Sequence, residues 1–208
     1  MSFLKEQYRL AFSFLRGDLR HYVRNTTIAF LVIYLVSLIG SILSPSVQDS
    51  LLAYIMNVIE NANISDEQGN ISAINICINN LRAAGFSIFY GIVPFLFLPA
   101  LPIGLNASVL GAVTASYWTG GRSMAALFAG LVPHCIFELP ALFIAFACGL
   151  YLCQDMTQSI RKKDEIRPPF SQVVKNLLRV YLTIIVPLLV VASFIEAYIT
   201  PICMSFFL

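Results

Sequence analysis

The sequence has little charge. Of its 208 residues, 12% are Asp, Glu, Lys or Arg and 58% are hydrophobic, whereas about a quarter of the residues in a soluble domain are charged. It has no glycine-rich phosphate loop, no Ser/His/Asp order typical of a hydrolase, and no basic stripe of the kind that binds nucleic acid. We therefore expect an integral membrane protein that is not an enzyme, has no catalytic residues and no cofactor, and binds no nucleic acid.

Cysteines in metal-binding or disulfide patterns are also absent. The five cysteines form no CxxC pair, and four lie in or beside apolar segments, where cysteine behaves as a small buried hydrophobe. Neither a disulfide framework nor a metal site is predicted from their spacing. Charged residues are spread over the first 24 positions without a compact apolar core, so a signal peptide is not expected either.

Long hydrophobic runs are what the sequence does have. A helix needs roughly 20 apolar residues to cross a ~30 Å hydrocarbon core, so the chain has room for about five spans. The predicted fold class is all-α, a polytopic transmembrane helix bundle forming a single membrane domain over residues 1–208. The predicted membrane segments are residues 27–43, 83–98, 103–118, 124–152 and 176–198.

Prolines and small residues divide and pack these segments. Pro99 and Pro102 bracket a turn, because each proline removes a backbone donor. Pro133 and Pro140 interrupt residues 124–152, which favours a short interfacial or re-entrant helix before Pro133 followed by a full span. A kink is expected at Pro187. Small residues predict close helix packing: Gly91, Gly104, Gly111, Ala115, Gly130 and Gly149.

Residues 1–26 have the pattern of a basic amphipathic helix. Apolar side chains recur at helical spacing, and a basic set lies on the neighbouring face, as in helices that lie in an anionic membrane surface. The basic residues are Lys5, Arg9, Arg16, Arg20 and Arg24. The alternative is a helix that packs within a larger cytoplasmic assembly.

Lysine and arginine predict the orientation. Eleven of the thirteen lie in the N-terminal helix or between residues 154 and 179, and cytoplasmic segments carry the excess of these residues. The N-terminus and a loop over residues 153–175 are therefore predicted to be cytoplasmic. The segment over residues 44–80, with a short helix near 51–59 and a loop at 61–70, is predicted to be external, as is the C-terminus.

The sharpest polar motif is Pro133-His134-Cys135-Ile136-Phe137-Glu138-Leu139-Pro140. His134 and Glu138 lie four residues apart and share one helix face. Because an ionisable group in the bilayer needs a partner or a wet cavity, three interpretations compete: a structural pin, a proton or ion pathway, and a metal site. The metal site is the least favoured, since the two residues supply two ligands where a catalytic zinc takes three and water.

Three other polar positions fall near this pair in a five-span topology. Glu196 ends the last span, while Asn79, Asn80 and Arg82 open the second. We expect an intramembrane polar cluster of Arg82, His134, Glu138 and Glu196, with the two asparagines as polar residues at the helix entry.

In this order, several runs of the sequence resemble the stage II sporulation protein M family. They are Asn79-Asn80-Leu81-Arg82-Ala83-Ala84, the glycine-containing paired spans that follow, Pro-His-Cys-Ile-Phe-Glu-Leu and the terminal Ile-Glu-Ala-Tyr-Ile-Thr-Pro. The resemblance covers most of the chain. Cys135 is a departure, since the family is expected to favour glycine after the histidine.

The resemblance implies a multi-pass protein of a bacterial cell membrane. In endospore formers the sporulation member acts in engulfment, as a scaffold for two partners that degrade septal peptidoglycan. We therefore expect a membrane scaffold that contacts the lipid bilayer and membrane or extracytoplasmic proteins, such as cell-wall hydrolases in peptidoglycan remodelling, with a homodimer as one option. The alternative is a transport subunit with an intramembrane His/Glu proton or ion relay.

Overall fold

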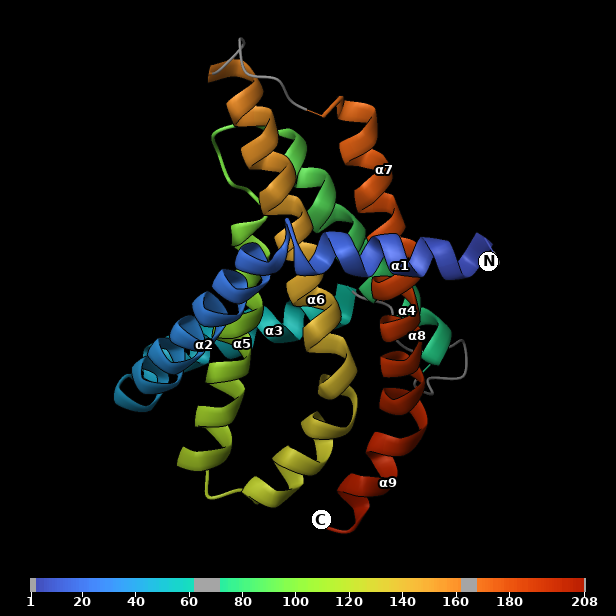
Figure 1. The fold of residues 1–208 in the computed structure, drawn as a ribbon. Coiled ribbons are helices and arrows are strands. Elements are labelled where there is room, and N and C mark those ends of the chain that lie inside the picture. Colours follow the sequence, from blue (N-terminus) through green and yellow to red (C-terminus); the bar gives the residue numbers. More distant parts are fainter. Residues whose placement is uncertain (1–2, 62–71, 162–167, 208) are drawn as a thin grey trace.

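A computed structural model describes residues 3–61, 72–161 and 168–207, and within these ranges the chain is helical, without a strand. Four helical stretches are long and apolar enough to cross a membrane: α2 (Arg20–Leu43), α5 (Ala100–Thr119), α6 (Met124–Arg161), and the consecutive helical segments from Phe170 to Ser205. Figure 1 shows them as a bundle in which α6 and the C-terminal helices run side by side in opposite directions. The predicted fold class is confirmed.

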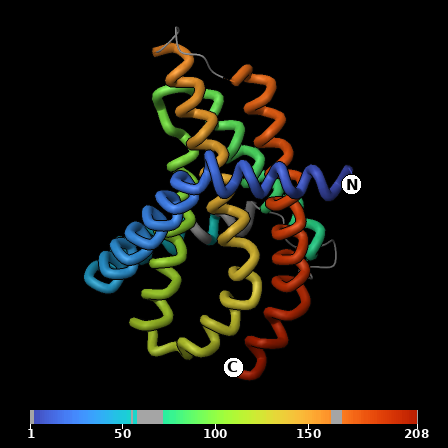
Figure 2. The backbone as a smooth tube through the Cα atoms, in the orientation of Figure 1, coloured from blue at the N-terminus to red at the C-terminus, as the bar shows by residue number. Residues whose placement is uncertain are grey.

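The N-terminal helix is shorter than predicted. Helix α1 (Phe3–Arg16) ends before Gly17, whose backbone N–H caps it on the carbonyl of Ser13 at 2.9 Å, and α2 then begins at Arg20. Residues 20–26, predicted to belong to the interfacial helix, are the first turns of α2. Figure 2 shows α1 lying across the bundle while α2 leaves at an angle.

Helix α2 packs along α5 through a glycine. A Cβ on Gly111 would lie 2.8 Å from the backbone oxygen of Tyr34 and from the backbone nitrogen of Leu38, so the two backbones approach as closely as glycine permits. The hydroxyl of Ser37 donates to the carbonyl of Ser108 at 2.7 Å across the same contact. The predicted packing role of Gly111 is therefore visible in this helix pair.

The predicted external segment is mostly helix where it is described. Helix α3 (Pro45–Asn61) is longer than the predicted 51–59 helix and contacts α2 and α5. The loop predicted at residues 61–70 lies outside the described residues, except for Asn61. Helix α4 (Ala73–Phe89) then begins behind Ser72, whose hydroxyl accepts from the N–H of Asn75.

The span predicted over residues 83–98 is corrected. Helix α4 ends at Phe89, a single 3₁₀ turn η1 (Tyr90–Ile92) follows, and residues 93–99 are not helical. Pro94 disfavours helical backbone at Val93, and Phe95 and Phe97 have positive φ angles of 68° and 47°. The irregular stretch is held by α6, because Thr157 Oγ1 accepts from the N–H of Phe95 at 2.8 Å.

Helix α6 runs without interruption through both of its prolines. The break predicted before Pro133 is absent, and the helix continues to Arg161, so residues 153–161 of the predicted cytoplasmic loop are helical. Pro133 and Pro140 instead accompany a bend: Figure 1 shows the first turns crossing the lower end of the bundle before the helix rises. Residues 162–167 lie outside the description.

The last span is a continuous helix that contains two wider turns. Helix α7 (Phe170–Val180) passes into the π turn η2 (Tyr181–Ile185), then α8 (Val186–Phe194), the π turn η3 (Ile195–Ile199) and α9 (Thr200–Ser205). Each π turn precedes a proline, Pro187 or Pro201. A proline cannot donate the usual backbone bond, and a π turn is a common way to absorb the irregularity.

Helix α6 is at the centre of the packing. It contacts α2, α4, α5, α8 and α9, and its side of the main core is built from small residues such as Ala141, Ala145 and Cys148. A Cβ on Gly149 would lie 2.2 Å from the carbonyl oxygen of Ser87, and one on Gly91 would lie 2.2 Å from that of Gly149. Helices α4 and α6 thus meet backbone to backbone.

Candidate functional site

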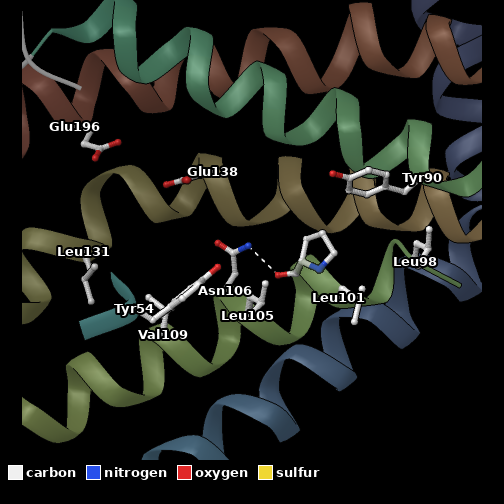
Figure 3. A pocket seen from close by; sticks show the side chains of 11 residues that line it. Tyr54, Tyr90, Leu98, Leu101, Leu105, Asn106, Val109, Leu131, Glu138 and Glu196 are labelled. Atoms are coloured by element: carbon white, nitrogen blue, oxygen red, sulfur yellow. Dashed lines mark hydrogen bonds between the residues drawn. The ribbon is translucent and has the colours of Figure 1, made fainter. Parts of the chain in front are cut away.

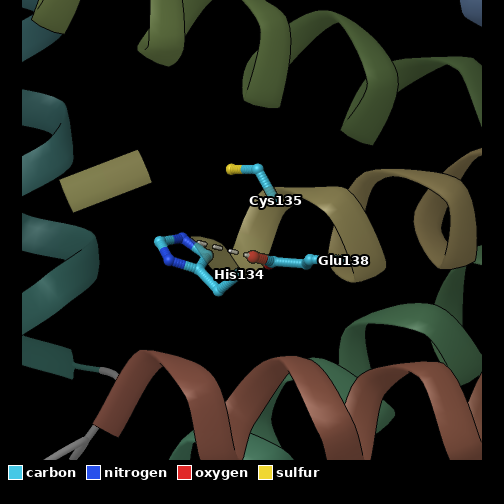
Figure 4. A group of neighbouring side chains, drawn as sticks. All are labelled: His134, Cys135 and Glu138. Atoms are coloured by element: carbon cyan, nitrogen blue, oxygen red, sulfur yellow. Dashed lines mark ion pairs between the residues drawn. The ribbon is translucent and has the colours of Figure 1, made fainter. Parts of the chain in front are cut away.

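The polar pair of α6 is formed as its spacing predicts. The Nε2 atom of His134 lies 3.8 Å from Oε2 of Glu138, with the imidazole nearly buried and the carboxylate partly exposed. The other ring nitrogen, Nδ1, lies 3.3 Å from Oγ1 of Thr200 on α9. Figure 4 shows the imidazole and the carboxylate turned toward each other on consecutive turns. The histidine therefore links α6 to the C-terminal helix.

Glu138 and Glu196 face one cavity. Glu196 lies in the π turn η3 and lines the same cavity as Glu138 on α6. The cavity has a volume of about 770 Å³ and apolar walls from α5 and α6, with Tyr54, Tyr90 and Asn106 as its other polar residues. Figure 3 shows both carboxylates on the same side of it. Such a space can hold a ligand, a lipid tail or water.

Arg82 is not part of this group. It is exposed on α4, where it lines a separate hollow with Phe86 and Tyr181. The neighbouring carbonyl of Leu81 accepts from the Tyr181 hydroxyl at 2.9 Å, and Tyr181 precedes Glu196 by fifteen residues, or about 22 Å of helix at 1.5 Å per residue. The predicted cluster is corrected to His134, Glu138 and Glu196, because Arg82 lines a different hollow from the cavity that the two glutamates share.

The asparagines at the helix entry remain outside the site. Asn79 is exposed on α4 and Asn80 is half-buried. Neither lines the cavity that the two glutamates share. Both lie within the helix and not at its start, since α4 begins at Ala73.

The basic residues of the N-terminal segment are on the surface. Lys5, Arg9 and Arg16 on α1, and Arg20 and Arg24 on α2, are all exposed. The buried side of α1 is Ala11 and Phe14, which join the core that includes α7, and Arg179 donates to Gln7 at 2.7 Å. An apolar set on α1 stays exposed: Phe3, Leu4, Tyr8 and Phe12.

Sequence reasoning missed two residues that the structure adds to the site. Cys135 follows His134 directly, and its Sγ lies with the His134 nitrogen and Glu138 oxygen in one group whose atoms are all within 4.8 Å of one another. Thr200 follows Glu196 by one helical turn. The four-residue spacing from Glu196 places Thr200 on the same helix face, which the sequence alone could have indicated. Its contact with His134 could not be predicted, because it depends on the packing of α9 on α6.

The fold and the site together define a polytopic α-helical membrane protein with a polar group between two of its long helices. The chain belongs to the stage II sporulation protein M family, which matches it over residues 26–201. It is also 29% identical over 127 residues to an uncharacterized protein of the archaeon Methanocaldococcus jannaschii, covering 61% of this chain and 70% of that protein. No solved structure matches it. The family resemblance is confirmed, and it supports a membrane location and a protein of the sporulation type.

Proposed function

We propose that this protein is a non-enzymatic membrane scaffold that recruits envelope partners, such as septal peptidoglycan hydrolases, to the outer face of the membrane. The observation that carries the proposal is the family match over residues 26–201. The match includes all the long apolar helices, and leaves out only the first turns of α2 and the last residues of α9. The family match supports a membrane protein of the sporulation type, and the scaffold role is our proposal from the resemblance to the sporulation member.

Helix α3 is the surface that we assign to partner binding. It follows α2 directly, lies along α2 and α5, and presents exposed polar side chains such as Asp49 and Ser50. Gln48 donates to Oγ1 of Thr119 at 3.3 Å, which ties the start of α3 to the end of α5. A helix anchored in this way offers a fixed polar face at the edge of the bundle.

A pulldown from mild detergent tests this assignment. Asp49→Lys reverses an exposed charge on α3, and Glu6→Lys makes the same kind of change on the exposed face of α1. We expect Asp49→Lys to reduce co-purified envelope proteins several-fold, as quantified by mass spectrometry, and Glu6→Lys to leave them unchanged. Equal recovery with both variants would remove α3 as the docking surface.

A transport subunit remains the second candidate because of one observation. Two carboxylates, Glu138 and Glu196, face a cavity between the long helices, and intramembrane carboxylates recur in proton and ion pathways. Proteoliposomes loaded with a pH-sensitive dye separate the two proposals. A scaffold gives no flux above empty vesicles, whereas a relay gives flux that Glu138→Gln abolishes in a protein that stays folded.

A further inference from the structure

Three different metal-binding groups lie together on α6. His134, Cys135 and Glu138 occupy positions i, i+1 and i+4 of the helix, and their donor atoms all lie within 4.8 Å of one another. Two donors on the same zinc ion cannot be farther apart than the sum of their bonds, about 4.0–4.6 Å for bonds of 2.0–2.3 Å. The His134–Glu138 separation of 3.8 Å already satisfies this limit, and the bound of 4.8 Å on the distances from the Cys135 thiol is close to it; Figure 4 shows the three side chains on neighbouring turns.

Thr200 orients the histidine for this role. With its proton on Nδ1, the imidazole donates to Oγ1 of Thr200 at 3.3 Å, and the Nε2 lone pair then faces Glu138. Histidines that bind metals usually donate their second ring nitrogen to an oxygen in this way, which fixes both the tautomer and the ring direction. The partner comes from α9, so the orientation depends on the folded bundle.

The charges around the group call for a cation. Glu196 on η3 lines the same cavity as Glu138, so a second carboxylate faces the space beside the group. The residues that line the cavity of the two glutamates include no lysine or arginine, and Arg82 is in another hollow. A divalent ion offsets two negative charges in a setting where an unpaired carboxylate is costly.

We propose that His134, Cys135 and Glu138 bind a divalent transition metal, with Glu196 or a water as the fourth ligand from the cavity side. The mixture of nitrogen, sulfur and oxygen donors suits zinc best, because magnesium and calcium take oxygen ligands almost exclusively. The site goes beyond the scaffold role and does not depend on it. It joins α6 to η3 and α9 at one end of the bundle.

Zinc titration of the purified full-length protein tests the site. The protein is first stripped of metal by chelation and dialysis, and titration should then load one zinc per chain. Cobalt titrated in place of zinc should show a thiolate-to-cobalt charge-transfer band in the near ultraviolet. Cys135→Ser and Glu138→Gln should each weaken zinc binding at least about 10-fold, and Thr200→Val should weaken it about 10–100-fold as the loss of an orienting partner. Cys77→Ser, at a partly exposed cysteine of α4, is the matched control and should bind as the parent does.

A second measurement needs no variant and so does not depend on how a variant folds. Zinc should slow the alkylation of Cys135 by a membrane-permeant maleimide at least about 10-fold, as followed by mass spectrometry of the peptides, and leave Cys77 unaffected. The proposal is overturned if zinc does not protect Cys135, or if stoichiometric binding and the cobalt band survive in Cys135→Ser. Either result would reduce the group to an adventitious cluster.

Discussion

Glu138 lies one helical turn after His134, and its carboxylate faces a cavity that Glu196 also lines. Its ion-pair partner is the imidazole of His134, whose other polar contact among the described residues is Thr200. The residue therefore pairs with the histidine that joins α6 to the C-terminal helix.

Substitutions of Glu138 separate a structural pin from a titrating group. We expect Glu138→Ala to lower the melting temperature in detergent, since breaking a buried pair on one side costs about 3–5 kcal/mol in soluble proteins and less in lipid. Glu138→Gln keeps the shape and the hydrogen-bonding capacity, so in metal-free protein it should melt near the parent. Glu6→Gln on the exposed face of α1 is the control. If Glu138→Ala melts with the parent, the pair is incidental to stability.

Glycines give the second test at the scale of single residues. A Cβ on Gly149 would lie 2.2 Å from the backbone oxygen of Ser87, whereas one on Gly104 would have nothing within 4 Å. Gly149→Ala should therefore force α4 and α6 apart, at a cost of about 1–3 kcal/mol typical of overpacked sites. Gly104→Ala, also inside a helix, should be neutral or stabilise by up to about 1 kcal/mol.

Thermal unfolding of the two glycine variants in the same detergent measures this difference. A lower melting temperature for Gly149→Ala with an unchanged or higher one for Gly104→Ala is the expected result. Equal effects would mean that the close approach of α4 and α6 is not what holds the two helices together.

Among the helices, the apolar spans could be predicted from the sequence, whereas the helix ends near prolines could not. The spans of α2, α5 and the last helix were predictable because each contains a long apolar stretch, and composition alone marks such segments. The bounds near prolines were not: Pro133 lies inside α6, while Pro94 ends the helical region after α4. Whether a proline bends or ends a helix depends on neighbouring groups that take over its lost backbone bonds, and those are tertiary contacts.

Part of the candidate site could also be predicted from the sequence, and part of it could not. The His134–Glu138 pair follows from helix periodicity, so the sequence predicted it. The position of Arg82 depends on how α4 packs against the C-terminal helices. Helix periodicity does not give this packing, and the irregular residues 93–99 and the π turns make it harder to infer from the sequence. Thr200 could not be assigned to the site from the sequence for the same reason. It contacts His134 through the packing of α9 on α6, directly after the π turn η3.

Helix α1 carries a prediction at the scale of one element. Its exposed side combines apolar Phe3, Leu4, Tyr8 and Phe12 with basic residues, and each basic residue near an anionic surface contributes about 1 kcal/mol. A peptide of residues 1–17 should bind anionic vesicles roughly 100-fold more tightly than the peptide with Lys5, Arg9 and Arg16 changed to Gln, a difference of about 3 kcal/mol.

Salt provides the check on that result. The advantage of the basic peptide should shrink as salt is raised, because the Debye length is ~8–10 Å near physiological ionic strength and shorter above it. Binding that does not respond to salt, or that is equal for both peptides, would argue that α1 is a packing helix on α7 without a role at the membrane surface.

For the whole molecule, the orientation in the membrane is a proposal that rests on the charge pattern of the sequence. Figure 1 shows the end of α6 and the start of α7, which flank the basic residues after Thr157, at the opposite end of the bundle from the α5–α6 turn and the C-terminus. We propose that the basic end and the N-terminus are cytoplasmic, and that α3 and the C-terminus are external. The scaffold proposal depends on this orientation, because envelope partners can reach α3 only from outside.

Thiol labelling in intact cells tests that orientation most directly. Ser46→Cys and Ser171→Cys are matched changes, each at an exposed serine directly after the first residue of a helix, α3 and α7 respectively. With the parent chain as the baseline for its five native cysteines, a membrane-impermeant maleimide should label Ser46→Cys in intact cells. It should label Ser171→Cys only after the membrane is opened. The reverse pattern would turn α3 toward the cytoplasm and contradict a scaffold for envelope partners.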